Sequence, residues 1–325
     1  MKKYLDLLRD VLENGEWKES AREGMPRTKE VFNRSIRLNL QDGFPLLTTK
    51  KVYFKGVIIE LLWFLRGDDN IRYLVNNNVH IWDSDAYKFY KRFGGTLSKE
   101  DFIDRCTGDK TLYKSSPYLA ENISGYKEYG RVGNIYGHQW RRFGSKDNSV
   151  DQISYLIHNL LVNPNSRYHL VSAWNPNDFI GSGLRAALPA CHVMFQCNVR
   201  NKRYLDISVI QRSCDVFLGV PFNLASYAAL THILAFITGY LPGELIWTGQ
   251  SVHIYENHMK AIEEQLLREP RKLPKLSIEY DGFNKDNPYI LENGEVKFDL
   301  WAMDNFVLKG YNPYPPIKAP LSVGV

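Results

Sequence analysis

Hydrophobic and polar positions along this chain repeat with two periods, one typical of helices and one typical of strands. Residues 2–14 carry apolar side chains at helical spacing, and Asn14-Gly15 supplies a stop. Residues 52–65 are apolar nearly all round, which predicts a buried helix. The same reasoning predicts further helices at residues 68–77, 151–161, 218–238 and 256–268.

Alternating apolar and polar residues predict strands between these helices. Two strands, at about 191–199 and 204–213, are joined by the basic turn Arg200-Asn201-Lys202-Arg203. Residues 19–34 are polar and irregular, which indicates a loop. Further strands are expected at residues 35–40, 167–174 and 244–249. This mixture of elements favours an α+β fold.

A polar stretch interrupts the pattern at about residues 84–130. It contains glycine pairs, a Ser-Ser-Pro turn and only weak helical patches, such as residues 99–105. No linker rich in Pro, Gly or Ser divides the 325 residues. We therefore predict one domain, residues 1–325, with an insertion at about 84–130 whose length costs little entropy if its ends lie close together.

Composition narrows the class of protein. Hydrophobic residues make up 44% and aromatic residues 13% of the chain, enough for a sizeable core. The net charge of +5 is spread over interleaved acids and bases, which favours a small anionic ligand, with RNA binding possible but not indicated. No signal peptide and no run of 18 apolar residues is present, so we expect a cytoplasmic protein that does not contact membranes.

Reactive side chains are densest between residues 188 and 227. Cys191 begins one predicted strand and Arg212 ends the next, so a thiol and a guanidinium are brought together. Such a cation can stabilise a thiolate and bind an anion, which makes Cys191 the best nucleophile candidate. The spacing of the cysteines fits no metal site, and we expect reduced thiols and no metal at Cys106, Cys191, Cys197 and Cys214.

Two more polar residues suggest chemistry. Glu60 lies within the apolar 52–65 helix, where a carboxylate is costly unless it is hydrogen-bonded or protonated. It is either a structural hydrogen-bonding residue or a general acid and base. Asn223 can donate and accept at once, as a pyrimidine edge requires. With Gln211, Ser213 and Asp215 nearby, these residues begin to describe a nucleotide site.

Motifs in a fixed order along most of the chain resemble the folate-dependent thymidylate synthases and the related pyrimidine nucleotide hydroxymethylases. The resemblance implies a large mixed sheet flanked by helices, with two such sheets packed back to back in a homodimer. The motifs are DGFPLLTTKK at 42–51, ELLWFLRGDDNI at 60–71, YGHQWR at 136–141, LPACH at 188–192, QRSCD at 211–215, LGVPFNLASY at 218–227 and HIYENH at 253–258.

The resemblance also implies a reaction, the reductive methylation of dUMP to dTMP with 5,10-methylenetetrahydrofolate as donor of carbon and hydride. It implies that Cys191 adds to C6 of the uracil and that Glu60 and Tyr136 assist proton movement. The implied nucleotide-binding residues are Arg22, Gln211, Arg212 and Ser213 with Asn223 at the uracil edge, His253 and Tyr255 at the ribose 3′-hydroxyl, and Arg167 reaching the phosphate of the neighbouring subunit. The implied folate-binding residues are Ile81, Trp82, Leu188, Asp215, Gly219 and Phe222.

Several positions depart from the family pattern. The phosphate loop, usually Arg-Thr-Gly-Thr-Gly-Thr, reads Arg-Glu-Gly-Met-Pro-Arg-Thr at 22–28, so Arg22 is the expected phosphate ligand and Arg27 the alternative. Arg167-Tyr168 replaces an Arg-Arg pair, and Asp85 replaces a second Trp. Gln250-Ser251-Val252 replaces Gly-Asp-Thr/Ala before His253, and the C-terminal tail is longer than usual.

Three functions follow as hypotheses. The first is thymidylate synthesis. The second is hydroxymethylation of a uridine nucleotide, or less favourably a cytidine nucleotide, because a changed tail could admit water in place of hydride. The cytosine-specific relatives carry Asp where this chain has Asn223, which argues against cytosine. The third is RNA binding by the basic loop with a vestigial site.

Overall fold

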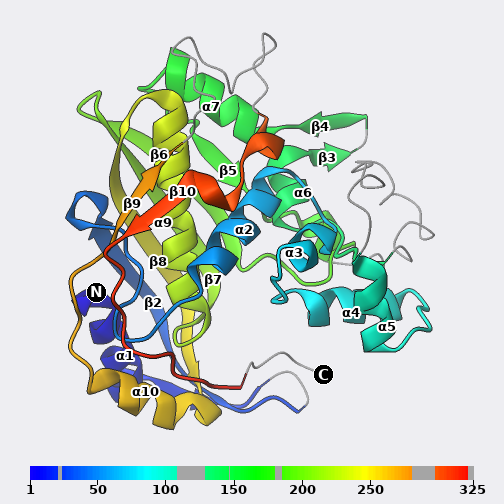
Figure 1. Ribbon diagram of the computed structural model, residues 1–325, viewed down its shortest axis with the longest axis vertical. Helices are drawn as coiled ribbons and strands as arrows, with labels where there is room; N and C mark the ends of the chain where they lie inside the picture. The colour runs from blue at the N-terminus through cyan, green and yellow to red at the C-terminus, as the bar shows by residue number, and fades with distance from the viewer. Residues whose placement is uncertain (21–23, 108–128, 146, 180–184, 280–296, 321–325) are drawn as a thin grey trace.

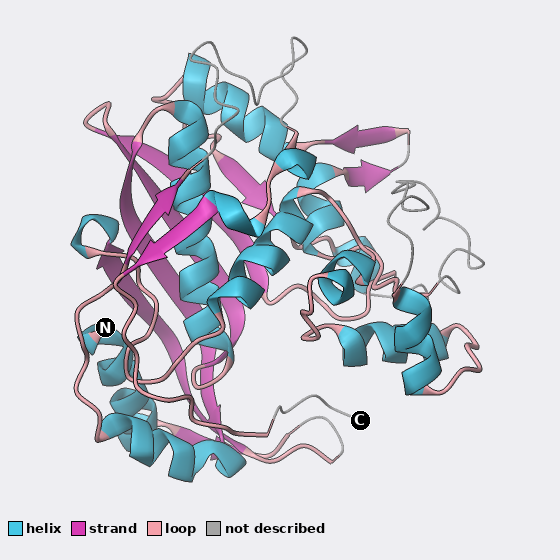
Figure 2. Ribbon diagram, viewed as in Figure 1, coloured by secondary structure: helices cyan, strands magenta, loops and turns pink. Residues whose placement is uncertain are grey.

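A large mixed sheet forms the centre of the protein (Figures 1 and 2). The computed structural model describes residues 1–20, 24–107, 129–145, 147–179, 185–279 and 297–320. Strands β7 and β8 are parallel, and all other neighbours in this sheet are antiparallel. The order is β1 (Glu16–Lys18), β2 (Thr28–Asn39), β8 (Leu241–Tyr255), β7 (Tyr204–Asp215), β6 (His192–Arg200) and β5 (Leu170–Ser172). The large mixed sheet expected from the sequence is therefore present.

Helices flank this sheet, and two small two-stranded sheets lie outside it. These sheets pair β3 (Phe143–Ser145) with β4 (Asn148–Val150), and β9 (Lys275–Ile278) with β10 (Phe306–Lys309). The helices are α1 (Lys2–Asn14), α2 (Phe54–Leu65), α3 (Arg72–Asn76), α4 (Asp83–Arg92), α5 (Lys99–Cys106), α6 (Tyr136–Arg141), α7 (Gln152–Val162), α8 (Pro176–Phe179), α9 (Gly219–Thr238) and α10 (Met259–Leu266).

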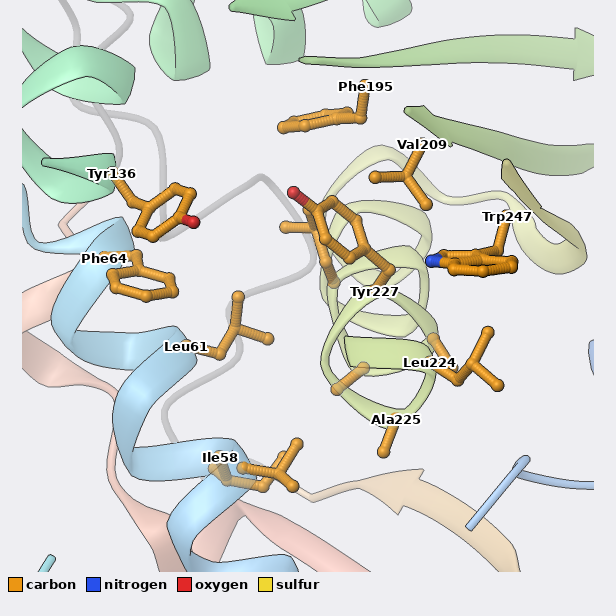
Figure 3. Packing of buried hydrophobic residues seen from close by; sticks show 14 of the residues in the cluster. Ile58, Leu61, Phe64, Tyr136, Phe195, Val209, Leu224, Ala225, Tyr227 and Trp247 are labelled. Atoms are coloured by element: carbon orange, nitrogen blue, oxygen red, sulfur yellow. The ribbon is translucent and has the colours of Figure 1, made fainter. Parts of the chain in front are cut away.

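The 20-residue helix α9 is the core of the domain. Its Leu224 and Tyr227 lie beside Val209 and Trp247 of the sheet (Figure 3). Gly239, with φ of 77°, ends the helix in a left-handed conformation that favours glycine. The helix has the length and hydropathy of a membrane span, but 78% of its apolar window is buried inside the protein. Burial against the sheet accounts for this composition.

Side chains alternate between the two faces of the sheet, as the period of a strand requires. Phe195, Val209 and Trp247 are fully buried on the face that α9 covers. The intervening residues Gln196, Ser208 and Ile246 are exposed or half-buried and line a separate cavity of about 340 Å³ on the opposite face. The sheet therefore has an apolar face against α9 and a more polar face directed away from it.

The bounds of strands β2 and β8 differ from the prediction. Strand β2 begins at Thr28, so residues 28–34, predicted as loop, belong to a strand, and β8 continues to Tyr255 rather than ending near 249. Pairing between β2 and β8 is continuous at this end, with Thr28 opposite Tyr255. The polar side chains of β2 find partners across the strands, so tertiary pairing overrides their irregular pattern.

The predicted insertion contains more helix than its composition indicates. Residues 83–92 and 99–106 form α4 and α5, which pack through Tyr87, Tyr90 and Phe102. Ser98 caps α5 by accepting a hydrogen bond from the Asp101 backbone amide at 3.1 Å. Residues 108–128 of the insertion lie outside the described part of the chain.

Candidate active site

A cavity of about 310 Å³ opens at one edge of the sheet. Because β7 and β8 are parallel, their carboxyl ends lie at the same edge, and the antiparallel strand β6 begins there. Helix α9 starts at this edge directly after β7. The predicted residues that line the cavity are Glu60, Ile81, Trp82, Tyr136, Leu188, Cys191, Gln211, Ser213, Asp215, Gly219, Asn223, His253 and Tyr255.

The Cys191 thiol faces the cavity beside a cation. Arg212 Nη2 lies 3.8 Å from Cys191 Sγ. The same guanidinium donates to the carbonyl oxygens of Ala190 and Pro189, each at 2.9 Å, which fixes its position. A positive charge at this distance favours the thiolate, the reactive form of cysteine. The thiol is half-buried, whereas the other three cysteines are buried.

The phenol of Tyr136 lies directly behind this thiol. Its oxygen accepts hydrogen bonds from the backbone amides of Cys191, at 2.8 Å, and His192, at 3.3 Å. Burial, and then the nearby Cys191, raise the pKa of Tyr136 well above its usual value. Tyr136 is therefore a neutral hydroxyl at physiological pH. Its ring packs on Phe64 with centroids 4.8 Å apart (Figure 3).

Glu60 is a half-buried carboxyl on α2 that lines the cavity. Trp82 Nε1 donates to its Oε1 at 2.7 Å. Burial raises the pKa of Glu60 to about 7, although the hydrogen bond from Trp82 opposes the shift. A carboxyl with this pKa is populated in both protonation states near neutral pH, which is the property that a general acid and base needs.

A chain of hydrogen bonds orients Asn223. Trp247 Nε1 donates to Gln211 Oε1 at 2.8 Å, and Gln211 Nε2 donates to Asn223 Oδ1 at 3.0 Å. Because Trp247 can only donate, it sets the orientation of the Gln211 amide, which in turn sets that of Asn223. His192 beside it is neutral, since burial lowers its pKa to about 4. The hydrogen bonds thus fix which atom of the Asn223 amide is the oxygen and which is the nitrogen at the cavity wall.

The carboxylate of Asp215 is held at the turn between β7 and α9. Its Oδ1 accepts from the backbone amides of Phe217 and Leu218, at 3.0 and 3.1 Å. The buried His258 places Nδ1 3.9 Å from this oxygen, and its Nε2 lies 2.8 Å from the carbonyl oxygen of Pro320. The C-terminal segment is therefore attached next to the Asp215 wall of the cavity.

Lys50 lies behind this wall, against Phe217, and the sequence reasoning overlooked it. Its ammonium donates to the Phe217 carbonyl oxygen at 2.5 Å and lies 3.4 Å from the centre of the Phe217 ring. Burial lowers the pKa of Lys50 to about 7, although the charge of Asp215 opposes the shift. The position of Lys50 in the DGFPLLTTKK motif was the available signal.

Three of the predicted site residues that the structure describes do not line the cavity. Arg212 contacts it through Cys191, and Phe222 is half-buried against the core. Arg167 lines the separate cavity on the opposite face of the sheet. Arg22 lies outside the described residues. Phe64, Asp85 and His192 line the cavity without having been assigned a role.

Arg27, the alternative phosphate ligand, is engaged elsewhere. Its Nε and Nη2 donate to Glu256 Oε1 at 2.9 and 2.6 Å, and its guanidinium lies 4.5 Å from the centre of the Trp17 ring. Recruiting Arg27 to a phosphate would require breaking this ion pair.

Replacing Trp247 by phenylalanine is expected to destabilise the fold by roughly 2–4 kcal/mol, because the buried Gln211 oxygen loses its donor and a small cavity forms. The shift in urea midpoint at constant m-value measures this loss. Nucleotide binding should weaken as well, since Asn223 loses its fixed orientation. The matched variant Trp63→Phe loses a similar buried bond, to Asn70 O at 2.9 Å, and should leave dUMP binding unchanged. Equal binding by both variants would contradict this role of Trp247.

Comparisons with known proteins agree with this geometry. A family model described as thymidylate synthase matches residues 2–323. Thymidylate synthase of Listeria monocytogenes serotype 4b (strain CLIP80459) is 43% identical over 335 residues, which cover 99% of this chain and all of the relative. Thymidylate synthase of Listeria innocua serovar 6a is 43% identical over 334 residues with the same coverage. The chain belongs to the thymidylate synthase family.

Proposed function

We propose that this protein, a one-carbon methyltransferase by family, forms dTMP from dUMP with 5,10-methylenetetrahydrofolate through a covalent bond to Cys191. The observation that carries the proposal is the cavity itself. It combines a thiol 3.8 Å from a guanidinium, a half-buried carboxyl with a pKa of about 7 and an oriented amide. We place this activity in the cytoplasm, where the thiol would stay reduced.

Nucleophilic addition is the first step. The thiolate of Cys191 would form a bond to C6 of the uracil, and the electron pair of the C5–C6 double bond would move toward C5 and the O4 carbonyl. Asn223 would hold the O4 and N3 edge by donating and accepting there. Arg212 would stabilise the thiolate before addition, and with Ser213 it would bind the phosphate.

Proton movements are assigned to Glu60 and Tyr136. Glu60 can both donate and accept near neutral pH, because its pKa is about 7. Tyr136 stays a neutral phenol, so we infer that it assists removal of the C5 proton by hydrogen-bonding a water or the base rather than as a phenolate. Elimination of Cys191 from C6 would then restore the double bond.

The other side of the cavity would hold the folate. Methylenetetrahydrofolate supplies the one-carbon unit and the hydride. Trp82 packs on Trp63, Phe64 and Tyr136 to form an aromatic wall, and Ile81, Leu188 and Gly219 extend it. Asp215 keeps Oδ1 bound to backbone amides, which leaves Oδ2 to accept from a pterin donor. Phe222, half-buried on α9, would complete it.

We also propose a homodimer in which the sheets pack back to back. The face directed away from α9 supports this, since it carries half-buried side chains and the cavity that contains Arg167. Arg167 lies on the opposite face of the sheet from its own Cys191 site, which favours a role in the site of a second subunit. Because Arg27 is bound to Glu256, Arg22 is the better candidate for the phosphate within the subunit.

Mixing two inactive variants should restore activity if the sites are shared. Cys191→Ala removes the nucleophile of its own site, whereas Arg167→Ala impairs only the partner's site. After unfolding and refolding together in equal amounts, about a quarter of the wild-type activity should return, because half of the dimers are mixed and each has one intact site. The separately refolded variants serve as controls. Activity no higher than the mean of these controls would contradict the shared site.

Product analysis tests the function itself. Wild-type protein with dUMP and methylenetetrahydrofolate should yield dTMP and dihydrofolate in equal amounts. Mass spectrometry would identify the nucleotide, and absorbance would measure the folate product. A hydroxymethylated nucleotide with tetrahydrofolate would show that water replaces hydride, and the proposal would then be wrong.

A further inference from the structure

Strand β8 departs from the family pattern directly before His253. The family has Gly-Asp-Thr/Ala there, and this chain has Gln250-Ser251-Val252. Ser251 lies two residues before His253 on the same strand, so the two side chains share one face. A neutral hydroxyl thus stands where the family has a carboxylate.

The neighbouring strand supplies a carboxylate at this point. Glu30 of β2 is the cross-strand partner of His253, and Ser251 is its diagonal neighbour. Ser251 Oγ donates to Glu30 Oε2 at 2.8 Å, and Lys18 Nζ donates to Glu30 Oε1 at 2.7 Å. Only 13% of the Glu30 side chain is exposed. The negative charge at this point therefore lies on β2, and Ser251 links it to His253.

The charge of Glu30 is maintained at neutral pH. Burial acts to raise the pKa of Glu30, but the hydrogen bonds from Lys18 and Ser251, then the charge of Lys18 and, when His253 is protonated, the charge of His253, outweigh it, so that the net pKa is lowered. An ionised carboxylate can only accept. Consequently, the Ser251 hydroxyl must direct its hydrogen toward Glu30 and its lone pairs elsewhere.

These constraints determine the tautomer of His253. Its Nδ1 lies 3.2 Å from the Ser251 carbonyl oxygen and 3.5 Å from Ser251 Oγ. The carbonyl can only accept, and the hydroxyl has already given its hydrogen to Glu30. In the neutral imidazole Nδ1 must therefore carry the proton, which leaves a lone pair on Nε2. Such an imidazole accepts a hydrogen bond from a ligand hydroxyl through Nε2.

We propose that Glu30 and Ser251 are positioning residues that hold His253 as the Nδ1–H tautomer, with Nε2 ready to accept from the 3′-hydroxyl of the nucleotide sugar. This inference rests on the proposed function and adds a specificity device to it. The Lys18–Glu30–Ser251–His253 chain connects the carboxylate on β2 to the imidazole on β8. Glu30 does not touch the substrate and acts only through Ser251 and His253.

A comparison of two nucleotides isolates this effect. Calorimetry would measure the dissociation constants of dUMP and of its 3′-deoxy analogue for wild type, Glu30→Ala and Ser251→Ala. Wild type should prefer dUMP about tenfold, the value of one hydrogen bond to a fixed acceptor. Glu30→Ala should lose most of this preference while binding the analogue as wild type does, because the released Ser251 hydroxyl can then donate to Nδ1. Ser251→Ala keeps the backbone carbonyl that accepts from Nδ1 and should retain the preference. Nitrogen NMR of the imidazole should show the Nδ1–H tautomer in wild type and a mixture in Glu30→Ala.

Restoring the carboxylate on β8 gives the sharpest test. The double variant Glu30→Ser with Ser251→Asp should recover the preference for dUMP. Glu244→Gln is the matched control, because it breaks a pair with Arg37, 2.6 Å long, between the same two strands away from His253. Glu30→Gln serves if Glu30→Ala does not fold, and it should weaken the preference and mix the tautomers too. A full preference and a single tautomer in the folded Glu30 variant would overturn the inference.

The outcome also separates this inference from the function. If wild type forms dTMP and the Glu30 variants retain the preference for dUMP, only the positioning role fails. If wild type forms no dTMP, the proposed function fails, while the binding comparison still decides the role of Glu30.

Discussion

Replacing Cys191 by serine is expected to lower kcat by at least about 10⁴-fold while the protein stays folded and still binds dUMP. A serine hydroxyl beside Arg212 is far less acidic than a thiol, so the anion needed for attack at C6 is scarce. The replacement changes one atom at a half-buried position and should leave thermal unfolding nearly unchanged. Single-turnover assays with dUMP would measure the loss, and calorimetry would confirm that the nucleotide still binds.

Two controls make this result specific. Burial raises the pKa of Cys106 to about 12, and it raises the pKa of Cys197 even further. Cys197→Ala should therefore retain kcat near the wild-type value. Alkylation with iodoacetamide should modify Cys191 first, and dUMP should protect it. Comparable activity of Cys191→Ser and wild type would rule out covalent catalysis at this thiol.

Local chemistry explains which parts of the site could be predicted. Cys191, Arg212 and Asn223 lie within 33 residues on adjacent elements. Their motifs resemble the thymidylate synthases, and the family model confirms that family. The buried helix that carries Glu60 was visible from its apolar pattern. In each case, the signal lies in residues close together in the sequence.

Contacts between distant segments were not predictable in this way. The bond from Ser251 to Glu30 joins residues 221 positions apart and depends on the register of β2 against β8. Residues 28–34 look like a loop, because their polar side chains reveal nothing of the partners they find across the sheet. The attachment of Pro320 to His258 depends likewise on where the tail lies in space.

Glu60→Gln is expected to have opposite effects on activity and stability. The amide oxygen can still accept from Trp82, so the local packing should survive. It cannot exchange a proton, and kcat should fall by about 10²–10⁴-fold. For wild type, the pKa of about 7 should appear in the pH dependence of kcat and should be absent in the variant. A residual rate within a few-fold of wild type would exclude Glu60 as the acid and base.

The stability effect follows from proton binding. The pKa of Glu60 is about 7 in the folded protein against 4.5 for the unperturbed group. Between these values the folded state binds more protons than the unfolded state, so wild-type stability falls as pH rises, by about 3 kcal/mol in total. The neutral amide of the Glu60→Gln variant carries no such penalty. Relative to wild type, the variant should gain little stability at pH 4.5 and about 3 kcal/mol above pH 7.

Denaturant unfolding of both proteins from pH 5 to pH 8 measures this difference. Glu264→Gln is the matched control, because Glu264 pairs with Arg268 on the surface of α10, where ion pairs contribute little. Its stability relative to wild type should barely change over the same range. A constant difference between Glu60→Gln and wild type would mean that Glu60 is not held in its protonated form by burial. The expected result is a stability advantage of Glu60→Gln that grows with pH, together with a loss of activity. That result would show that the Glu60 carboxyl destabilises the fold at neutral pH and that the reaction requires its proton.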